Sequence, residues 1–403
     1  MTDKTEATYI QSLGHGRSTF ALTSYLYALM TIYAVSITMI GPMMPHIIDE
    51  YGLRLSQGGL ILTFQSIGGI LAIIIVGIVS DAVKKPRLIL TAYLSFGLAL
   101  FMVGYIRSFP VLLAVFFLFG AGTRISDTVL NAYVSDIHTS RRGVFLNLLH
   151  SFFGVGAFIG PMYARYLLEQ GIPWNRVFSF LGLACIFIII FMPIASKKVD
   201  YTKDVQKTSG INQWDSLLKS PIMWILGIIM IMYVGHQSSI IVWMPMYMET
   251  VLRVSPTVSS LAISVFWLGI IVGRLLCSHL TKRFSAISLL LGGCFLGGLV
   301  LTAGLAIKIP NLLILCLGFT GLFTGAAIPL LVTIACDRFP HNSGTASSMI
   351  FICGSISTLI FPWLVGTIAE VFNFQWAMLL SGLILLAIAG MTIFIQTFRS
   401  LFL

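Results

Sequence analysis

Charged and amide side chains recur at helical spacing in one apolar stretch, VLLAVFFLFGAGTRISDTVLNAYV, residues 111–134. The spacing i, i+4, i+7, i+11 puts four residues on one helical face: Gly120, Arg124, Asp127 and Asn131. A charge at the centre of a membrane span costs about 2.5 to 3.5 kcal/mol, so such residues usually face a bundle interior or a water-filled route. We therefore expect this stripe to line a transport route.

Asp127 is the first candidate for a proton carrier, because it is the only acid expected to be buried within an apolar span, away from the ends of the span. Burial and a nearby cation act in opposite senses on the proton affinity of a carboxylate. Motion of Arg124 relative to Asp127 would therefore load and release a proton. Arg124 would also bind an anionic group through its guanidinium. The alternative is a permanent ion pair that only neutralises two buried charges.

The next apolar stretch carries Asn147 and His150. The two stretches are antiparallel across a short loop, so Asp127 and His150 should lie at similar depth. Amides donate and accept hydrogen bonds, and a guanidinium grips an oxyanion, so these groups suit a hydroxyl-rich or carboxylate-bearing solute. His150 is a second candidate for proton coupling, although a lone histidine on a helix is often structural.

Further candidate substrate contacts lie in the second half of the chain. His236 and Gln237 interrupt an apolar stretch, and Trp243 follows two turns later on the same face. Trp267 lies in the next stretch. Aromatic rings that stack on sugar faces beside amides would complete a carbohydrate site; ordinary packing is the alternative. Arg274 is expected to organise helix packing or gating.

Composition places the chain among membrane proteins that cross the bilayer many times. Hydrophobic residues make up 57%, charged residues only 9%, and the mean hydropathy is +0.96. The net charge of +10 is spread over short tracts without interleaved aromatics, so no nucleic-acid partner is expected. The six cysteines lack metal spacing, and neither a GxSxG nor a P-loop motif occurs, so neither a metal site nor an enzyme is expected.

The hydropathy pattern predicts twelve transmembrane helices in an all-α protein. Placing both termini in the cytoplasm puts most Lys and Arg inside, in agreement with the positive-inside rule. The first 18 residues lack a signal-peptide pattern, so the first span should be retained. The expected spans are 19–44, 57–79, 88–106, 110–135, 143–167, 174–195, 221–250, 257–280, 286–307, 311–335, 344–368 and 375–398.

A long polar connector divides these spans into two six-helix bundles that resemble each other at an offset of 201 residues. Gly68 maps to Gly269, Gly120 to Gly321 and Pro161 to Pro362, and LRLS after the first span recurs as LRVS after the seventh. A duplicated transporter places its site at the repeat interface near the bilayer midplane. The expected organisation is a cytoplasmic N-terminus (1–18), an N-terminal bundle (19–195), a linker (196–220), a C-terminal bundle (221–398) and a cytoplasmic C-terminus (399–403).

The loop after the second span reads GIVSDAVKKPR. It resembles the G-x-x-x-D-x-x-G-R-K signature of the major facilitator superfamily, with a lysine in place of the second glycine. The resemblance implies the twelve-helix fold of that superfamily. An acid beside cations at a helix end would pin two helices in one gating state; a charged turn that only fixes topology is the alternative. The gating candidates in this loop are Gly77, Asp81, Lys84, Lys85 and Arg87.

Two other stretches are similar to the fucose-proton-symporter-like sugar branch of the superfamily. They are NLLHSFFGVGAFIGP in the fifth span and FWLGIIVGR, ending at Arg274, in the eighth. The chain departs from that branch because its first span lacks an acid and because Arg124 is not expected in a carrier of neutral sugars. The fifth-span GxxxGP also resembles drug-proton antiporters, and sodium-coupled glucose carriers are similar in the same stretch.

These observations predict a secondary transporter that moves a small polar solute, a sugar or a sugar acid or other organic anion, by proton symport. The alternatives are a proton-coupled antiporter that exports drugs or metabolites and a sodium-coupled sugar carrier. We expect no cofactor beyond the coupling ion, H⁺ or alternatively Na⁺. The expected partners are the substrate and the lipid bilayer, and the protein is expected to act as a monomer in the cell (inner) membrane. A receptor or membrane enzyme would need a sizeable extramembrane domain or a nucleophile constellation, and neither is present.

Overall fold

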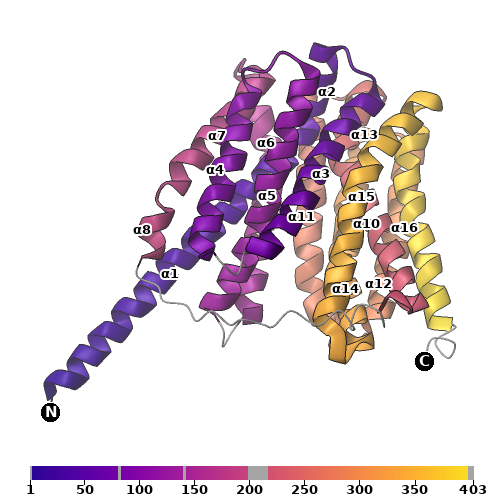
Figure 1. Cartoon of the computed structure of the whole chain (residues 1–403). Helices are drawn as coiled ribbons and strands as arrows, with labels where there is room; N and C mark the ends of the chain where they lie inside the picture. Colours follow the sequence, from indigo (N-terminus) through magenta and orange to yellow (C-terminus); the bar gives the residue numbers. More distant parts are fainter. Residues whose placement is uncertain (1, 80–82, 139–141, 198–216, 398–403) are drawn as a thin grey trace. The chain divides into compact units, whose positions relative to one another are not determined.

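A computed structural model describes residues 2–79, 83–138, 142–197 and 217–397. The chain is 89% helical, without strands in these ranges. Twelve segments are long and apolar enough to cross a membrane, as predicted (Figure 1). Asp81, most of the linker and the end of the chain lie outside the described residues.

Helices follow one another along the chain with short connections. Those of the N-terminal half are α1 (Thr2–Thr38), α2 (Ile40–Tyr51), α3 (Leu55–Val79), α4 (Lys85–Val103), α5 (Phe109–Ile137), α6 (Arg142–Glu169), α7 (Trp174–Ile189) and α8 (Met192–Ser196). Those of the C-terminal half are α10 (Pro221–Thr250), α11 (Pro256–Leu280), α12 (Ala286–Ile307), α13 (Pro310–Thr324), α14 (Ala327–Arg338), the short 3-10 helix η2 (Pro340–Asn342), α15 (Ser343–Val371) and α16 (Phe374–Thr397).

Three of the twelve spans are interrupted, which the hydropathy pattern did not predict. A proline removes a backbone N–H, and its ring clashes with the carbonyl four residues earlier. Each interruption lies about one turn before a proline, so the missing N–H and the clash explain where the helix breaks. The prolines are Pro42 in the first span, Pro193 in the sixth and Pro329 in the tenth.

The first span also extends further than expected, because helix α2 continues to Tyr51 rather than ending near residue 44. It ends at Gly52, whose φ of 58° lies in the left-handed region that suits glycine. The repeat mate of Gly52 is Arg253, which adopts the same φ of 58°. The backbone of the turn after the first span of each half is therefore repeated, although the residue type is not.

The glycines related by 201 residues bring helices together in the same way in both halves. A Cβ on Gly120 would lie 1.8 Å from the carbonyl oxygen of Gln65, and a Cβ on Gly321 would lie 2.2 Å from that of Phe266. Gln65 and Phe266 are themselves repeat mates. The second and fourth spans of each half thus approach to backbone contact, which confirms the predicted repeat.

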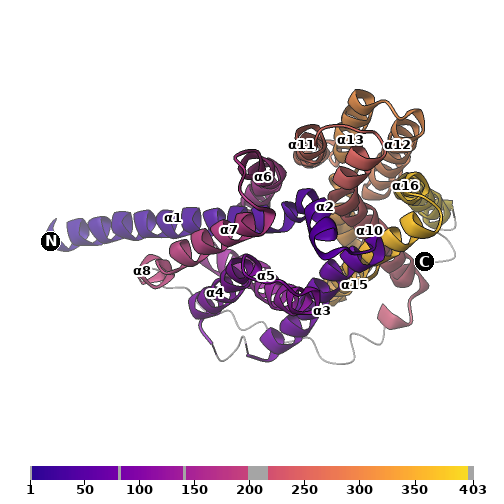
Figure 2. The same cartoon turned by 90° about the horizontal axis from the view of Figure 1, so that it is seen from above.

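The chain divides into two compact units that do not follow the boundary between the halves. The first contains Met1–Ile37, Phe64–Ala157 and Gly171–Gln206; the second contains Thr38–Thr63, Phe158–Gln170 and Lys207–Leu403. In the first unit, α4 packs against both α5 and α7 (Figure 2). The second unit therefore includes one end of the first, second and fifth spans.

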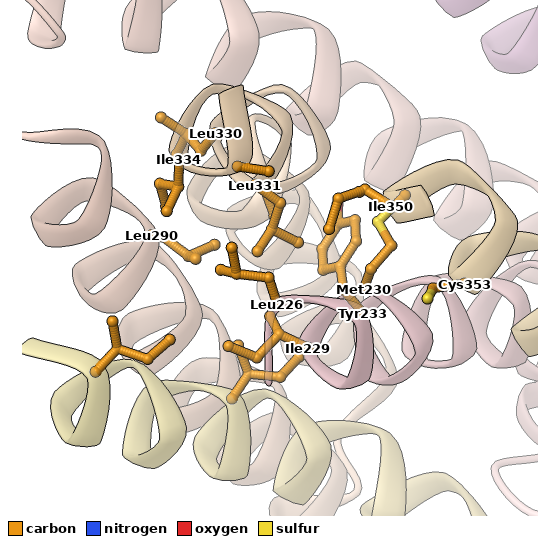
Figure 3. Packing of buried hydrophobic residues seen from close by; sticks show 14 of the residues in the cluster. Leu226, Ile229, Met230, Tyr233, Leu290, Leu330, Leu331, Ile334, Ile350 and Cys353 are labelled. Carbon is orange, nitrogen blue, oxygen red and sulfur yellow. The ribbon is translucent and has the colours of Figure 1, made fainter. Parts of the chain in front are cut away.

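The second unit has an apolar core where α10 meets α12, α14, α15 and α16. Leu226 and Tyr233 of α10 lie among Leu290, Leu331 and Ile350, all of them buried (Figure 3). Close packing of such side chains makes a core sensitive to small changes in volume. This core includes α14, the second part of the interrupted tenth span.

Candidate functional site

The polar stripe lies on α5, which is continuous for 29 residues. Arg124 Nη1 lies 3.8 Å from Asp127 Oδ2, and the two side chains are 35% and 26% exposed. This separation exceeds the 2.7 to 3.2 Å usual for a hydrogen bond. Asn131 donates from Nδ2 to Asp127 Oδ1 at 3.1 Å and to the Asp127 carbonyl at 2.8 Å. The amide thus orients the carboxylate, while the arginine stays half-exposed beside it.

Gly120 does not contribute a polar surface to this stripe; its role is the backbone contact with Gln65 on α3. One turn further along α3, Gly69 faces Arg124, whose Cβ would lie 3.3 Å from a Cβ at that glycine. The Gln65 side-chain oxygen Oε1 is buried and has no hydrogen-bond partner among the described residues. The sequence analysis did not identify Gln65 as a site residue. The available signal was an amide side chain in an apolar span, one helical turn before Gly69.

Two tyrosines that the sequence interpretation did not single out adjoin the stripe. Tyr33 on α1 is buried and interacts electrostatically with both Asp127 and Arg124. Tyr93 on α4 also interacts with Asp127, and its hydroxyl donates to the Leu29 carbonyl at 2.7 Å. Phenols in otherwise apolar spans give no periodic signal, so only the electrostatic interactions of Tyr33 and Tyr93 with Asp127 in the folded chain reveal them.

Asn147 and His150 both lie at exposed positions on α6. One turn beyond His150, Phe153 packs against Tyr33 with ring centroids 5.7 Å apart. Tyr33 therefore contacts α6 on one side and the Asp127 environment on the other. The expected pocket that joins Asp127 to His150 remains a prediction, and Tyr33 is the residue that links the two helices.

His236 and Gln237 lie on α10 in the second unit. His236 is wholly buried, and its Nδ1 lies 3.0 Å from the Ser381 carbonyl on α16. The Nε2 atoms of His236 and Gln237 are buried without a hydrogen-bond partner among the described residues. His236 is packed between helices, and the substrate contacts expected of His236 and Gln237 stay predictions.

The two tryptophans are likewise enclosed. Trp243 is fully buried and donates from Nε1 to the Pro362 carbonyl on α15 at 2.9 Å, while Trp267 of α11 is 3% exposed and packs beside Phe266. The bond of Trp243 ties α10 to α15. These surroundings favour the packing alternative over stacking on a sugar ring.

Arg274 stabilises the interruption of the tenth span. Its Nε donates to the Gly325 carbonyl at 2.9 Å, and the Tyr233 hydroxyl donates to the neighbouring Thr324 carbonyl at 2.8 Å. Gly325 stands four residues before Pro329, which has no N–H to give. The guanidinium thus replaces the missing backbone donor. Of the two roles expected for Arg274, helix packing and gating, this contact corresponds to helix packing.

The superfamily-like loop is described only in part. Gly77 lies in α3, Asp81 lies outside the described residues, and Lys84 and Arg87 are exposed at the start of α4. Lys85 forms an ion pair with Asp136 at the end of α5. Lys85 thereby joins two helices of one half, a partnership that the loop sequence alone did not indicate.

Another titratable group at this end of α5 is His138, which follows the last residue of the helix. Its ring stacks on Phe145 at 3.4 Å, and Nε2 lies 2.8 Å from Thr23 Oγ1. Because the Thr23 hydroxyl donates to the Thr19 carbonyl, the Nε2–H of His138 donates to Thr23. Burial lowers the pKa of His138 below its usual value of 6.5. The surroundings of His138 at this end of α5 therefore favour the neutral form of its imidazole ring.

No cluster suited to a metal ion occurs in the part of the chain that the structure describes. The half-exposed groups that come together are Arg124, Asp127 and Asn131, with Tyr33 and Gln65 beside them. They can hold a proton, an oxyanion and hydroxyl groups. They offer no nucleophile with a matched base and acid.

Curated relatives cover most of the chain. A TsgA homolog from Buchnera aphidicola subsp. Schizaphis graminum is 25% identical over 334 residues, which is 80% of this chain and 82% of that protein. Protein TsgA of Shigella flexneri is 25% identical over 358 residues, covering 86% of this chain and 87% of the relative.

Solved structures share the fold at low sequence identity. A bacterial homolog of the human lysosomal transporter Spinster, in an inward-facing and unoccupied conformation, has a TM-score of 0.79 and 14% identity; the match covers 93% of this chain and 96% of that one. A point mutant of the nucleoside transporter NupG has a TM-score of 0.77 and 11% identity, covering 93% of this chain and 99% of that one.

The family model of the Major Facilitator Superfamily matches residues 26–299 and 228–399. The twelve spans, the repeat and the polar stripe agree with that match. A multi-pass membrane protein of this kind moves a solute by secondary transport and is not an enzyme. The chain belongs to the Major Facilitator Superfamily.

Proposed function

We propose that this transporter carries a small hydroxylated solute with an anionic group, such as a sugar acid or another organic anion, by symport with protons. The observation that carries the proposal is the half-exposed Arg124 beside Asp127 in the middle of α5. A buried pair that only neutralised its charges would be closed at hydrogen-bonding distance and shielded on all sides. This pair is neither.

Arg124 is the proposed anion clamp. Among the described residues, its guanidinium donates no hydrogen bond at ordinary distance, so its donors are free for a carboxylate oxygen pair. Gln65 Oε1, buried without a partner in the described structure, supplies an acceptor for a substrate hydroxyl. An unpaired acceptor of this kind costs free energy until a ligand or water satisfies it.

Asp127 is the proposed proton carrier. Asn131 orients its carboxylate, and the Arg124 guanidinium lies beside it. A substrate anion that engages Arg124 draws the cation away from Asp127, so that Asp127 takes up a proton. Solute and proton would then bind together, which is the requirement for symport.

Uptake by proteoliposomes tests this assignment. A thermal-shift screen of sugars, sugar acids and amphipathic cations, at two pH values with and without Na⁺, first identifies the ligand. Asp127→Asn should then lower pH-driven uptake at least about 100-fold while exchange of the same solute across the membrane continues. Arg124→Gln should weaken binding of anionic ligands by about tenfold or more.

Thr128→Val is the matched control, because Thr128 lies on the same helix and, in the part of the chain that the structure describes, its hydroxyl bonds only to the Arg124 carbonyl. It should leave both readouts near wild type. Preserved pH-driven uptake in Asp127→Asn would remove the proton assignment. Stabilisation by Na⁺ with no pH effect would favour sodium coupling instead. Binding of amphipathic cations alone would favour export of lipophilic compounds.

A further inference from the structure

A carboxyl group that the proposed transport cycle does not use lies where α10 ends and α11 begins. Glu249 is in the last turn of α10, and its side chain contacts Ser259 in the first turn of α11. Ser259 is fully buried, and Glu249 is partly buried. Both residues belong to the second unit. They lie at the ends of their spans that are opposite to the predicted cytoplasmic loops, which we call the outer ends.

The Ser259 hydroxyl has two acceptors but only one proton. Its Oγ lies 2.5 Å from Glu249 Oε1 and 2.9 Å from the Pro256 carbonyl oxygen. A hydroxyl donates one hydrogen bond and can accept others. When Glu249 is ionised, Ser259 can donate to the carboxylate or to the carbonyl, but not to both. When Glu249 carries a proton, the carboxyl group donates to Ser259 and Ser259 donates to Pro256, so both contacts become hydrogen bonds.

The equivalent position in the first half is apolar. The 201-residue offset relates Glu249 to Ile48 and Ser259 to Gly58. A Cβ on Gly58 would lie 3.0 Å from Ile48 Cδ1, so the two residues of each pair lie against each other in both halves. Packing between these helix ends therefore requires neither a carboxyl group nor a hydroxyl group. The polar pair is a feature of the second half alone.

A cation acts on this carboxyl group. Arg165 of α6 interacts electrostatically with Glu249, while its Nε donates to Glu169 Oε1 at 2.9 Å. His46 of α2 interacts with the same arginine and with Asp49. A proton on Glu249 therefore changes the charge that surrounds Arg165. The other titratable groups at the outer ends of the neighbouring elements are Glu50 and Tyr51 of α2, Tyr166 of α6, Tyr247 of α10, Arg253 in the turn after α10 and Glu370 of α15.

We propose that Glu249 and Ser259 form a proton-binding site in the second half of the protein, in addition to Asp127 in the first. The partly exposed carboxyl group takes its proton from the outer side. Proton uptake reverses the hydrogen bond between Glu249 and Ser259 and turns the Ser259 hydroxyl toward the Pro256 carbonyl. This inference goes beyond the proposed function, because it depends neither on the substrate nor on the role of Asp127.

Infrared difference spectra between neutral and acidic pH test the site without any substrate, because they detect the protonation of carboxyl groups. The full chain is measured in nanodiscs. Glu249→Gln should remove one carboxyl band from the wild-type spectrum. Ser259→Ala should keep this band but move its midpoint by about 0.5 to 1 pH unit, since the carboxyl group loses a hydrogen-bond partner. Asp127→Asn should leave the band and its midpoint as in the wild type.

Glu50→Gln is the matched control, because it removes an exposed acid at the outer end of the first span. It should leave the Glu249 band and its midpoint unchanged. If Glu249→Gln fails to fold, the double variant Glu249→Ile, Ser259→Gly reproduces the residues of the first half and should lack the same band. Identical spectra for Glu249→Gln and the wild type, or a midpoint that does not respond to Ser259→Ala, would overturn the proposal.

A sodium ion is the competing ligand, because carboxylate, hydroxyl and carbonyl oxygens also bind hard cations. If Na⁺ at neutral pH raises the melting temperature of the wild type but not that of Glu249→Gln, the site binds sodium and the proton assignment is wrong. A failure of Asp127→Asn to change uptake would instead contradict the proposed function and leave the Glu249 band in place.

Discussion

The fourth and tenth spans begin with the same packing and diverge one turn later. In both, a glycine (Gly120 or Gly321) meets the backbone of the second span of its half. At the next turn the fourth span has Arg124, whereas the tenth has Gly325, its repeat mate. One span is a continuous helix, α5, with a half-exposed cation; the other is broken into α13 and α14.

The intramembrane arginines of the two halves, Arg124 and Arg274, therefore have different roles. Arg124 lies on the fourth span beside Asp127, and within the described ranges its guanidinium makes no hydrogen bond at ordinary distance. Arg274 lies on the eighth span and donates to the carbonyl that Pro329 leaves without a partner. The duplicated fold kept the close helix contact in both halves, while one half became a candidate binding site and the other a packed scaffold.

The largest expected effect tests what the halves share. Gly120→Ala and Gly321→Ala each push a Cβ into the backbone of the neighbouring span, at 1.8 and 2.2 Å. Overpacking of this kind costs about 3 kcal/mol, so the apparent melting temperature in detergent should fall by roughly 4 °C in both variants. Gly292→Ala has no heavy atom within 4 Å and should be neutral. A lower melting temperature in only one of the two variants would show that the two glycine contacts are not equivalent.

The next effect separates the two arginines. Arg274→Leu orphans the buried Gly325 carbonyl and should cost about 1 to 3 kcal/mol of stability. Arg124→Leu removes a cation that makes no close hydrogen bond in the described structure, so its melting temperature should not fall. Thermal unfolding of both variants decides the question, and equal losses would show that the arginines play similar roles.

A double-mutant cycle sharpens the explanation of the broken span. Pro329→Ala restores an N–H that can bond to Gly325, so Arg274→Leu should cost about 1 kcal/mol less in that background. Pro193→Ala, in the sixth span, serves as the control background, where the cost of Arg274→Leu should be unchanged. Strict additivity in the Pro329→Ala background would contradict the replacement of a backbone donor by Arg274.

The smallest effect concerns the residue that follows each span, His138 after α5 and Phe339 after α14. Because burial lowers the pKa of His138, the folded protein binds a proton there less readily than the unfolded chain does. The contribution of His138 to stability is full above pH 6.5 and falls as the pH drops below that value. His138→Phe should remove less than about 1 kcal/mol of the pH dependence between pH 7 and 5. A pH profile identical to wild type for His138→Phe would refute the assignment.

Much of the architecture was predictable from local pattern. Apolar runs of about 20 residues predict spans wherever they occur, because backbone groups within lipid must bond inside a helix. The recurrence of Gly68, Gly120 and Pro161 at one offset predicted the repeat, and the packing of Gly120 and Gly321 explains it. Each of the three helix breaks lies one turn before a proline, but α6, α10 and α15 continue past Pro161, Pro245 and Pro362, so a proline alone does not predict a break.

Contacts between distant segments were not predictable. Tyr33 beside Asp127, Lys85 paired with Asp136 and Arg274 bonded to Gly325 each depend on which helix faces which, and hydropathy does not encode that. The same limit explains why His236 and Trp243 were expected in a substrate site, although their surroundings are those of packed residues.

The sequence by itself determined the twelve helices, the duplication and the presence of an intramembrane Arg124 and Asp127, because hydrophobic length and the cost of a buried charge are local properties. Only the tertiary structure decided which polar residues stay half-exposed, which one satisfies a broken helix and which join the second span of one half to the fifth span of the other. Those outcomes depend on distances between residues up to about 300 positions apart in the chain, such as Ser56 and Glu370, and such distances arise only when the helices pack.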